Sequence, residues 1–294
     1  MSGGLHPGPR PPSPRTGRAQ HGDVSLYYEE HGEGHPVVLI HGWTLNCRMW
    51  DDQVDALSAK YRVICYDRRG FGQSTGHPET AMDAHDLAEL LDRLDIPRAS
   101  VLGMSQGGCA ALYFALDHPD RTAALVLNAT ILPGFNLPFS GPDRVPADQY
   151  AEAARSRGMD AMRDLWVGHP FYAVARTRPH VLARLREIVA AYSGADLTQV
   201  KVPAVGGGAD AVARMSELDL PTLILIGEHD VPYIQVVAHA LAYGIRNATT
   251  VTLPGCDHLA NMEAPEAFND ALIRFLDTVD WNRAGRIPSG AAQP

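Results

Sequence analysis

The chain has 294 residues, a formal net charge of −9 and a pI near 5.8. Nucleic acids and anionic membranes require concentrated basic surface, so neither is expected as a main partner of so acidic a chain. Hydrophobic residues make up 45% of the sequence, but no run approaches the roughly 18 consecutive apolar residues of a transmembrane helix.

Residues 1–21 are rich in Pro, Gly, Ser and Arg and lack the apolar stretch of a secretory signal. They are predicted to form a disordered N-terminal tail, and residues 282–294 are predicted to form a second tail. The four cysteines show no CxxC spacing, so neither a zinc site nor a disulfide framework is expected. These features together predict a cytoplasmic protein.

Short apolar runs alternate with amphipathic helical patterns along most of the chain. The runs predicted as strands are 24–29, 37–40, 62–66, 99–102, 124–127, 222–226 and 248–253. Strands that alternate with helices favour right-handed crossovers and a mostly parallel sheet covered on both faces. The predicted class is therefore α/β, and residues 22–132 and 218–281 are expected to form its core.

The alternation stops between the runs 124–127 and 222–226. Helical patterns occupy about 147–157, 159–167 and 179–192 instead, after breaks that contain Pro and Gly. We interpret residues 133–217 as a helical cap inserted into the core, with Gly206 to Gly208 as a connector. Its aromatic side chains would form the roof of a pocket, and the candidate pocket residues are Phe135, Phe139, Trp166 and Tyr172.

A serine lies in the sequence Gly103-Met104-Ser105-Gln106-Gly107, between a predicted strand and a predicted helix. This is the context that the G-x-S-x-G motif requires, because its glycines let the chain turn sharply and present the hydroxyl above the sheet edge. Ser105 is therefore the candidate nucleophile.

A serine hydroxyl is a weak nucleophile near neutral pH, so it needs a base and a third group that orients the base. The run 222–226 leads into a loop in which Asp230 is the candidate acid. Glu228, two residues away, and Asp257, beside the candidate base, are the alternatives.

The run 248–253 leads into a loop that contains His258, the candidate general base. His229 is an alternative, but it precedes the acid and breaks the expected order. With His258 the chain order is Ser, Asp, His, and each residue follows the C-terminal end of a predicted strand.

The intermediate of acyl transfer carries an oxyanion, which must meet fixed hydrogen-bond donors. The run 37–40 leads into His41-Gly42-Trp43, where the glycine allows the backbone to approach a substrate closely. The backbone N–H groups of Trp43 and Gln106 are the candidate donors of this oxyanion hole. His41 is expected to hold the loop by hydrogen bonds rather than to act as a base.

Five motifs in this order resemble the α/β-hydrolase superfamily, and the resemblance covers residues 22–281. The motifs are His41-Gly42-Trp43, residues 67–74, the serine motif, Gly227-Glu228-His229-Asp230 and Asp257-His258. Stretches 41–52 and 67–74 are most similar to cofactor-free haloperoxidases (perhydrolases) and 3-oxoadipate enol-lactonases. Gln106 stands where those relatives usually carry methionine, and the segment after residue 132 is more similar to the lactonase cap.

The candidate triad and the resemblance together imply a serine hydrolase. Its expected substrate is a small to medium, partly apolar carboxylic ester or lactone, cleaved through an acyl-enzyme without a metal or organic cofactor. The same residues would serve a cofactor-free perhydrolase or haloperoxidase, or a hydrolase of carbon–carbon bonds. A small-molecule receptor that keeps the hydrolase fold is the alternative from another class. The sequence leaves the oligomeric state open.

Overall fold

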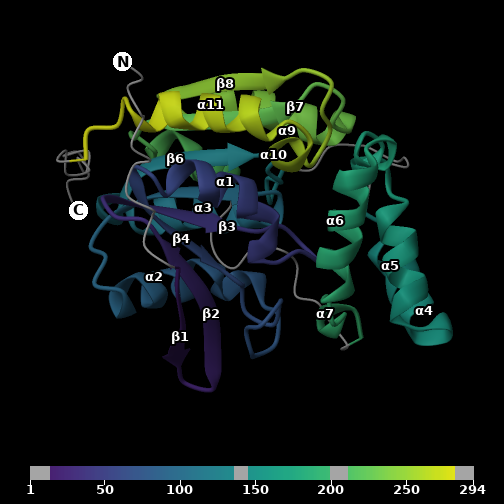
Figure 1. The fold of residues 1–294 in the computed structure, drawn as a ribbon. Helices are drawn as coiled ribbons and strands as arrows, with labels where there is room; N and C mark the ends of the chain where they lie inside the picture. Colours follow the sequence, from purple (N-terminus) through teal and green to yellow (C-terminus); the bar gives the residue numbers. More distant parts are fainter. Residues whose placement is uncertain (1–13, 136–144, 199–210, 282–294) are drawn as a thin grey trace, which may run out of the picture.

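The computed structural model describes residues 14–135, 145–198 and 211–281. They form an eight-stranded sheet in the order β1-β2-β4-β3-β5-β6-β7-β8 (Figure 1). The strands are β1 (Arg15–His21), β2 (Val24–His31), β3 (His35–Ile40), β4 (Tyr61–Tyr66), β5 (Ala99–Met104), β6 (Thr122–Asn128), β7 (Thr222–Gly227) and β8 (Ala248–Leu253). From β4 to β8 all neighbours are parallel, whereas β1 and β2 join antiparallel. The predicted α/β class is confirmed.

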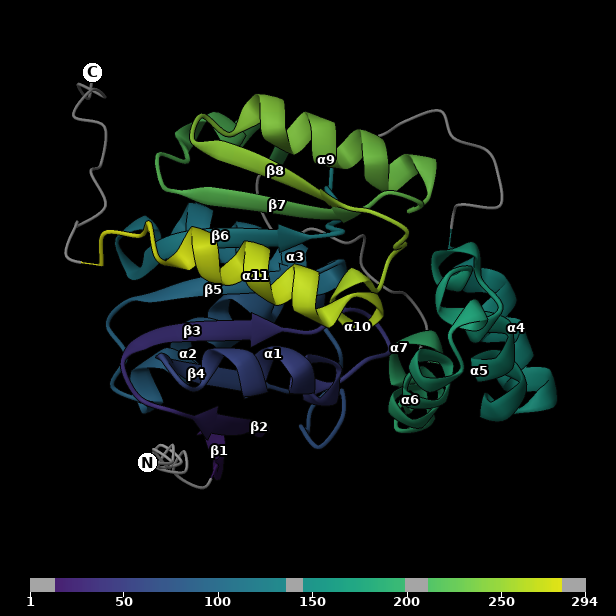
Figure 2. The same cartoon turned by 45° about the horizontal axis from the view of Figure 1, so that its top comes forward.

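Helices cover the sheet on both faces, and Figure 2 shows α1 and α11 in front of it and α2 and α3 behind it. The α-helices are α1 (Asp51–Leu57), α2 (Asp83–Arg93), α3 (Gln106–Asp117), α4 (Ala147–Arg157), α5 (Met159–Val167), α6 (Pro179–Ala190), α7 (Ala195–Thr198), α8 (Ala211–Arg214), α9 (Pro232–Gly244), α10 (Ala260–Glu263) and α11 (Pro265–Leu276). Short 3-10 helices span Cys47–Trp50, Thr80–Met82, Pro119–Arg121, Pro170–Tyr172, Ala175–Thr177 and Met215–Glu217.

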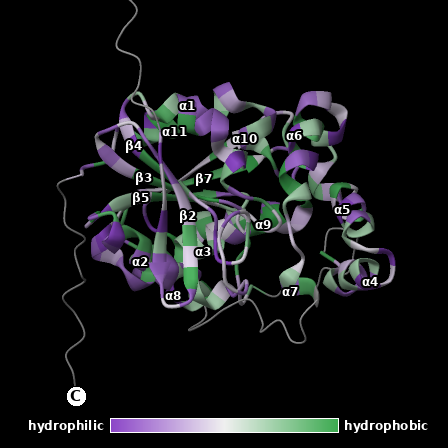
Figure 3. Ribbon diagram, turned by 60° about the horizontal axis from the view of Figure 1, so that its bottom comes forward, coloured by the Kyte–Doolittle hydropathy of each residue, from purple (hydrophilic) through white to green (hydrophobic). Residues whose placement is uncertain are grey.

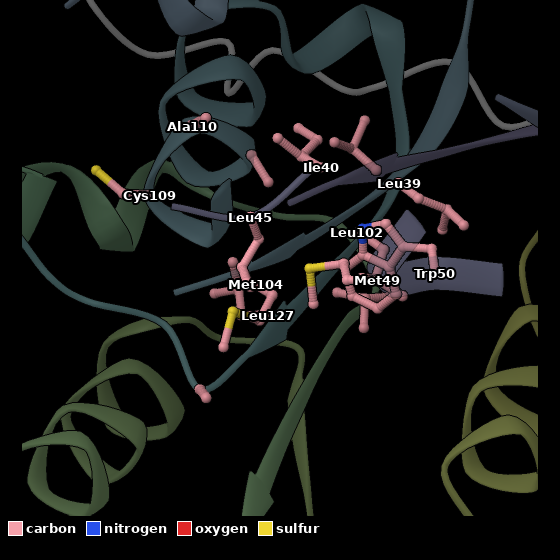
Figure 4. Close-up of a cluster of buried hydrophobic side chains, with 14 of the residues drawn as sticks. Leu39, Ile40, Leu45, Met49, Trp50, Leu102, Met104, Cys109, Ala110 and Leu127 are labelled. Carbon is pink, nitrogen blue, oxygen red and sulfur yellow. The ribbon is translucent and has the colours of Figure 1, made fainter. Parts of the chain in front are cut away.

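The central strands are apolar because both of their faces are covered. Every residue of β5, β6 and β7 is buried, and the hydrophobic colouring of Figure 3 concentrates in the sheet. Parallel strands buried on both faces read as continuous apolar runs, which is why they could be recognised in the sequence. Figure 4 shows part of the resulting core, to which the sheet, α3 and the first 3-10 helix contribute Leu39, Ile40, Met49, Trp50, Leu102, Met104, Cys109, Ala110 and Leu127.

Strand β1 corrects the predicted N-terminal tail. That prediction is wrong for Arg15–His21, which pairs with β2 through a turn at Gly22 with a φ of 56°, and residues 1–13 lie outside the described part of the chain. As an edge strand β1 buries only Ala19, so its stability comes from backbone pairing and its composition resembles that of a loop. The predicted tail 282–294 also lies outside the described residues.

Helices α4 to α7, here called the helical insertion (residues 145–198), connect β6 to β7. They lie beyond the C-terminal ends of the parallel strands, toward which the arrowheads point in Figures 1 and 2. The three predicted helical patterns correspond to α4, α5 and α6. The predicted connector Gly206 to Gly208 lies outside the described residues.

Candidate active site

Ser105 lies in the sharp turn between β5 and α3. Its φ of 53° and ψ of −115° are rare for any residue with a side chain, and such strain concentrates at functional sites. The Ser105 N–H donates to the carbonyl of Asn128 over 2.9 Å, and its own carbonyl accepts from the N–H of Cys109 over 3.1 Å. The surrounding backbone therefore holds the turn that the serine motif predicts.

The glycines of this motif are required by close packing. A Cβ on Gly107 would collide with the carbonyls of Ile40 and His41, and one on Gly103 would collide with the carbonyl of Gly107. Strand β5, helix α3 and the end of β3 can approach one another only because these positions lack side chains.

The loop after β3 passes directly beside Ser105. A Cβ on Gly42 would lie 3.5 Å from the Cβ of Ser105 and 2.7 Å from Sδ of Met104. This places the backbone of the predicted oxyanion loop next to the candidate nucleophile. The next residue along that loop is Trp43, whose N–H is one of the two candidate donors.

His41 holds the loop after β3 in place by hydrogen bonds, as the sequence predicts. Its Nε2 accepts the N–H of Arg68 over 2.9 Å, so the proton resides on Nδ1, which donates to the carbonyl of Gly42 over 2.7 Å. Burial, with a smaller contribution from the charge of Arg68, lowers the pKa of His41 to about 3. The ring is therefore neutral and both of its nitrogens are engaged.

Asp230 and His258 form a buried pair. Nδ1 of His258 lies 3.0 Å from Oδ2 and 3.2 Å from Oδ1 of Asp230, and the two side chains are 2% and 0% exposed, respectively. Burial raises the pKa of Asp230, and the neighbouring imidazole of His258 opposes that rise. The alternatives Glu228 and His229 have side chains that are 53% and 58% exposed, so they lie outside this pair.

The third candidate acid, Asp257, binds elsewhere. Its Oδ2 accepts the N–H of Val174, from the helical insertion, over 2.6 Å. Its own N–H donates to Oε2 of Glu263 over 2.7 Å. Asp257 therefore connects the loop after β8 to the insertion, and Asp230 is the carboxylate that contacts His258.

The loops that carry Asp230 and His258 pack against each other at the ends of adjacent strands. The N–H of His229 donates to the carbonyl of Cys256 over 2.7 Å. Among the described residues no hydrogen bond joins the Ser105 hydroxyl to His258. Such bonds are often long in ligand-free enzymes and shorten when a substrate binds.

The helical insertion contacts this site through aromatic side chains. Phe171 stacks on the imidazole of His258, with ring centroids 4.0 Å apart and an interplanar angle of 8°. Of the predicted pocket residues, Trp166 and Tyr172 are 3% and 1% exposed, respectively. Phe135 is partly buried against the core, and Phe139 lies outside the described residues.

Comparison with known protein families identifies the family of this chain. The profile of the alpha/beta hydrolase fold family matches residues 35–265. The chain belongs to the α/β-hydrolase family. Its fold and its similarity to known esterases and lactonases make it a hydrolase.

Three similar proteins illustrate the range of this family. A non-heme chloroperoxidase from Kitasatospora aureofaciens is 31% identical over 86% of this chain and 96% of its own length. The enol-lactonase from Burkholderia xenovorans LB400 is 28% identical, with a TM-score of 0.75 over 89% of this hydrolase and 100% of that chain. A thermophilic esterase from Thermogutta terrifontis is also 28% identical, with a TM-score of 0.75 over 90% of this hydrolase and 98% of the esterase. No helix in the described part of this hydrolase is long and apolar enough to cross a membrane.

Arg68 is a site residue that the sequence did not reveal. Its guanidinium pairs with Asp83 through two contacts, of 3.1 and 2.5 Å, and donates to Oε1 of Gln106 over 2.8 Å. The side chain of Gln106 is thus bound to a buried cation. These contacts of Arg68 become visible only in the folded structure, because a buried ion pair has no signature in the local sequence.

Asp196 is the second residue that sequence reasoning missed. Its carboxylate accepts the indole N–H of Trp43 over 2.6 Å and the hydroxyl of Tyr192 over 2.6 Å. Next to Trp43, the indole N–H of Trp166 donates to the hydroxyl of Thr44 over 2.6 Å. Two consecutive residues of the loop after β3, Trp43 and Thr44, are therefore hydrogen-bonded to the insertion. Asp196 follows Trp43 by 153 residues, so no sequence pattern could have linked them.

Proposed function

We propose that this hydrolase cleaves a carboxylic ester or lactone through an acyl-enzyme formed on Ser105. The observation that carries the proposal is the buried Asp230–His258 pair, with a 3.0 Å contact, at the same end of the sheet as the strained Ser105. The structural neighbours described as an enol-lactonase and an esterase support this substrate class.

In the proposed mechanism, Asp230 orients His258 and stabilises the imidazolium that forms. Because Nδ1 of His258 contacts Asp230, Nε2 is the nitrogen that takes the proton of Ser105. The serine oxygen attacks the carbonyl carbon, and the imidazolium then protonates the leaving oxygen. A water molecule repeats the sequence and releases the acid.

The backbone N–H groups of Trp43 and Gln106 would receive the oxyanion. Gln106 is the first residue of α3, so its N–H has no acceptor within the helix, and the helix N-terminus favours negative charge. Gly42 keeps the loop that contains Trp43 within reach of Ser105. Loss of one donor of this kind typically lowers the rate by about 100-fold or more.

The helical insertion would act as the cap of the substrate pocket, with the cap boundaries at 133–217. We assign Trp166, Tyr172, Phe135 and Phe139 to the pocket, together with Phe171, whose ring lies on His258. A roof rich in aromatic side chains suits a small to medium, partly apolar substrate.

The proposal is tested with a panel of aryl esters, alkyl esters and lactones, assayed with the wild type and Ser105→Ala. We expect turnover of at least one class, with an initial burst of leaving group equal to the enzyme concentration for esters whose deacylation is slow. Ser105→Ala should abolish both the burst and the turnover. Undiminished turnover by Ser105→Ala would exclude the acyl-enzyme on this residue.

Perhydrolysis is a second candidate, because the relative from Kitasatospora aureofaciens, 31% identical, is named a non-heme chloroperoxidase. In that reaction hydrogen peroxide replaces water as the acceptor of the acyl group. The assay supplies acetate, peroxide and halide and follows halogenation. Halogenation that requires Ser105 would favour perhydrolysis, whereas efficient lactone or ester turnover without peroxide and no halogenation would remove it.

A further inference from the structure

Three side chains of the metal-binding type meet at the edge of the sheet, away from the candidate active site. His21 ends β1, while His85 and Glu89 lie four residues apart on one face of α2. One potential ligand atom of each lies within 4.8 Å of the others. His21 and His85 are 64 residues apart, so no local sequence pattern reveals this cluster.

The two nitrogens of His21 have different partners. Nδ1 lies 3.1 Å from Oε2 of Glu89, and Nε2 lies 3.2 Å from Nε2 of His85. The carboxylate of Glu89 favours the tautomer of His21 that has its proton on Nδ1. Nε2 of His21 then has a free lone pair, which is directed at His85. This is the arrangement in which a metal-binding histidine is oriented by a carboxylate behind it.

The spacing of the two imidazoles also fits a shared cation. Two ligands about 2.0–2.1 Å from a tetrahedral zinc ion are about 3.3 Å apart. The Nε2 atoms of His21 and His85 are separated by 3.2 Å. An N–H···N hydrogen bond alone would give a similar distance, so the two explanations must be separated by experiment.

Solvent access and nearby charges are compatible with a bound cation. The side chains of His21 and Glu89 are 38% and 33% exposed, which leaves room for water to complete the coordination. Arg93, one turn further along α2, directs its guanidinium to the carbonyl of Gln20 over 3.0 Å. Arg93 is the positively charged residue of this helix nearest to Glu89 in sequence, and its guanidinium is thus bound to a backbone carbonyl.

We propose that this cluster is a binding site for a divalent transition-metal ion such as Zn²⁺. Nε2 of His21 and Nε2 of His85 are the ligands, Glu89 orients His21, and water fills the remaining positions. The bound ion would connect the edge strand β1 to helix α2. It takes no part in the proposed hydrolysis.

The test titrates Zn²⁺ alone into the untagged, metal-stripped full chain and measures binding by calorimetry and equilibrium dialysis. We expect one Zn²⁺ per chain at this cluster and a higher Tm when Zn²⁺ is present. His85→Ala and His21→Ala should each weaken binding at least about tenfold, and Glu89→Gln should weaken it by about 10- to 100-fold.

The matched control is His239→Ala, which removes a histidine on α9 whose Nδ1 bonds the carbonyl of Gln235 over 2.7 Å. It should leave Zn²⁺ binding unchanged, and His85→Ala should leave esterase activity unchanged. Co²⁺ in place of Zn²⁺ should give visible absorption that is lost in His85→Ala. The proposal is overturned if no Zn²⁺ binds, or if binding survives in both His85→Ala and His21→Ala.

Discussion

Phe171 lies flat against the imidazole of His258, with ring centroids 4.0 Å apart. Phe171 belongs to the connection between α5 and α6. The candidate base, His258, is therefore hydrogen-bonded to Asp230 from the core and stacked on an aromatic ring from the insertion. The insertion therefore contributes to holding the candidate base.

Phe171→Leu tests this contact, since leucine keeps apolar bulk but removes the stacked ring. An aromatic contact contributes about 0.5–1.5 kcal/mol beyond the area it buries, so kcat should fall by up to about tenfold. Steady-state kinetics on the best ester substrate measures the effect. Phe275→Leu, which removes a ring from α11, is the control and should keep wild-type kcat. Equal kcat values for Phe171→Leu and the wild type would show that the stacking has no catalytic consequence.

Asp230→Asn tests the orienting carboxylate. An amide cannot stabilise the imidazolium and favours the wrong tautomer of His258, so kcat should fall by a factor on the order of 10⁴. Glu228→Gln, at a side chain that is 53% exposed, makes the same chemical change two residues away and should remain active. If Glu228→Gln were the inactive variant and Asp230→Asn the active one, the assignment of the acid would be wrong.

The raised pKa of Glu263 leads us to expect that the free energy of unfolding depends on pH. Burial, followed by its hydrogen bond to Asp257, raises the pKa of Glu263 from 4.5 to about 9. Oε1 of Glu263 is buried without a hydrogen-bond partner in the described structure, and burial of this kind disfavours the charged form of a carboxyl group.

Because Glu263 holds its proton more tightly in the folded chain, its contribution to stability is complete below pH 4.5 and disappears as the pH rises through about 9. Urea unfolding across this range should show that Glu263→Gln removes part of the decline seen in the wild type. The stability of Glu266→Gln, a control variant at an exposed position of α11, should decline with rising pH as that of the wild type does. Identical pH profiles for the wild type and Glu263→Gln would contradict the raised pKa of Glu263.

Arg68 and Asp83 form an ion pair whose side chains are only 1% and 5% exposed. Arg68→Met leaves Asp83 as an unpaired buried charge, which typically costs about 3–5 kcal/mol in the free energy of unfolding. The double variant Arg68→Met/Asp83→Leu should recover much of that loss. Urea unfolding of the three variants, including Asp83→Leu, measures the coupling, and strictly additive losses would show that the pair is not coupled.

The residues of the candidate site could be proposed from the sequence because Ser105, Asp230 and His258 each follow an apolar run that is typical of a buried strand. Parallel strands end at one edge of a sheet, so the loops that contain Ser105, Asp230 and His258 are expected at that edge, and the contact between Asp230 and His258 agrees with this expectation. The same reasoning pointed to the loop after β3, where the structure places Gly42 beside Ser105. These features depend on local sequence and on a general rule of topology.

Other features depend on tertiary contacts that local sequence does not encode. Strand β1 is polar because it lies at the edge, so composition alone suggested a tail. The bond from Trp43 to Asp196 joins residues 153 positions apart, and the ion pair of Arg68 with Asp83 is recognisable only once both are buried. Such contacts require the folded arrangement to be known.

The most direct test of the central claim is labelling of the folded enzyme with a fluorophosphonate, followed by mass spectrometry of its peptides. We predict one adduct per chain on Ser105, with labelling lost in Ser105→Ala and slowed in Asp230→Asn. An enzyme that hydrolyses esters while Ser105 stays unmodified, or that carries its adduct on another residue, would contradict the proposed nucleophile.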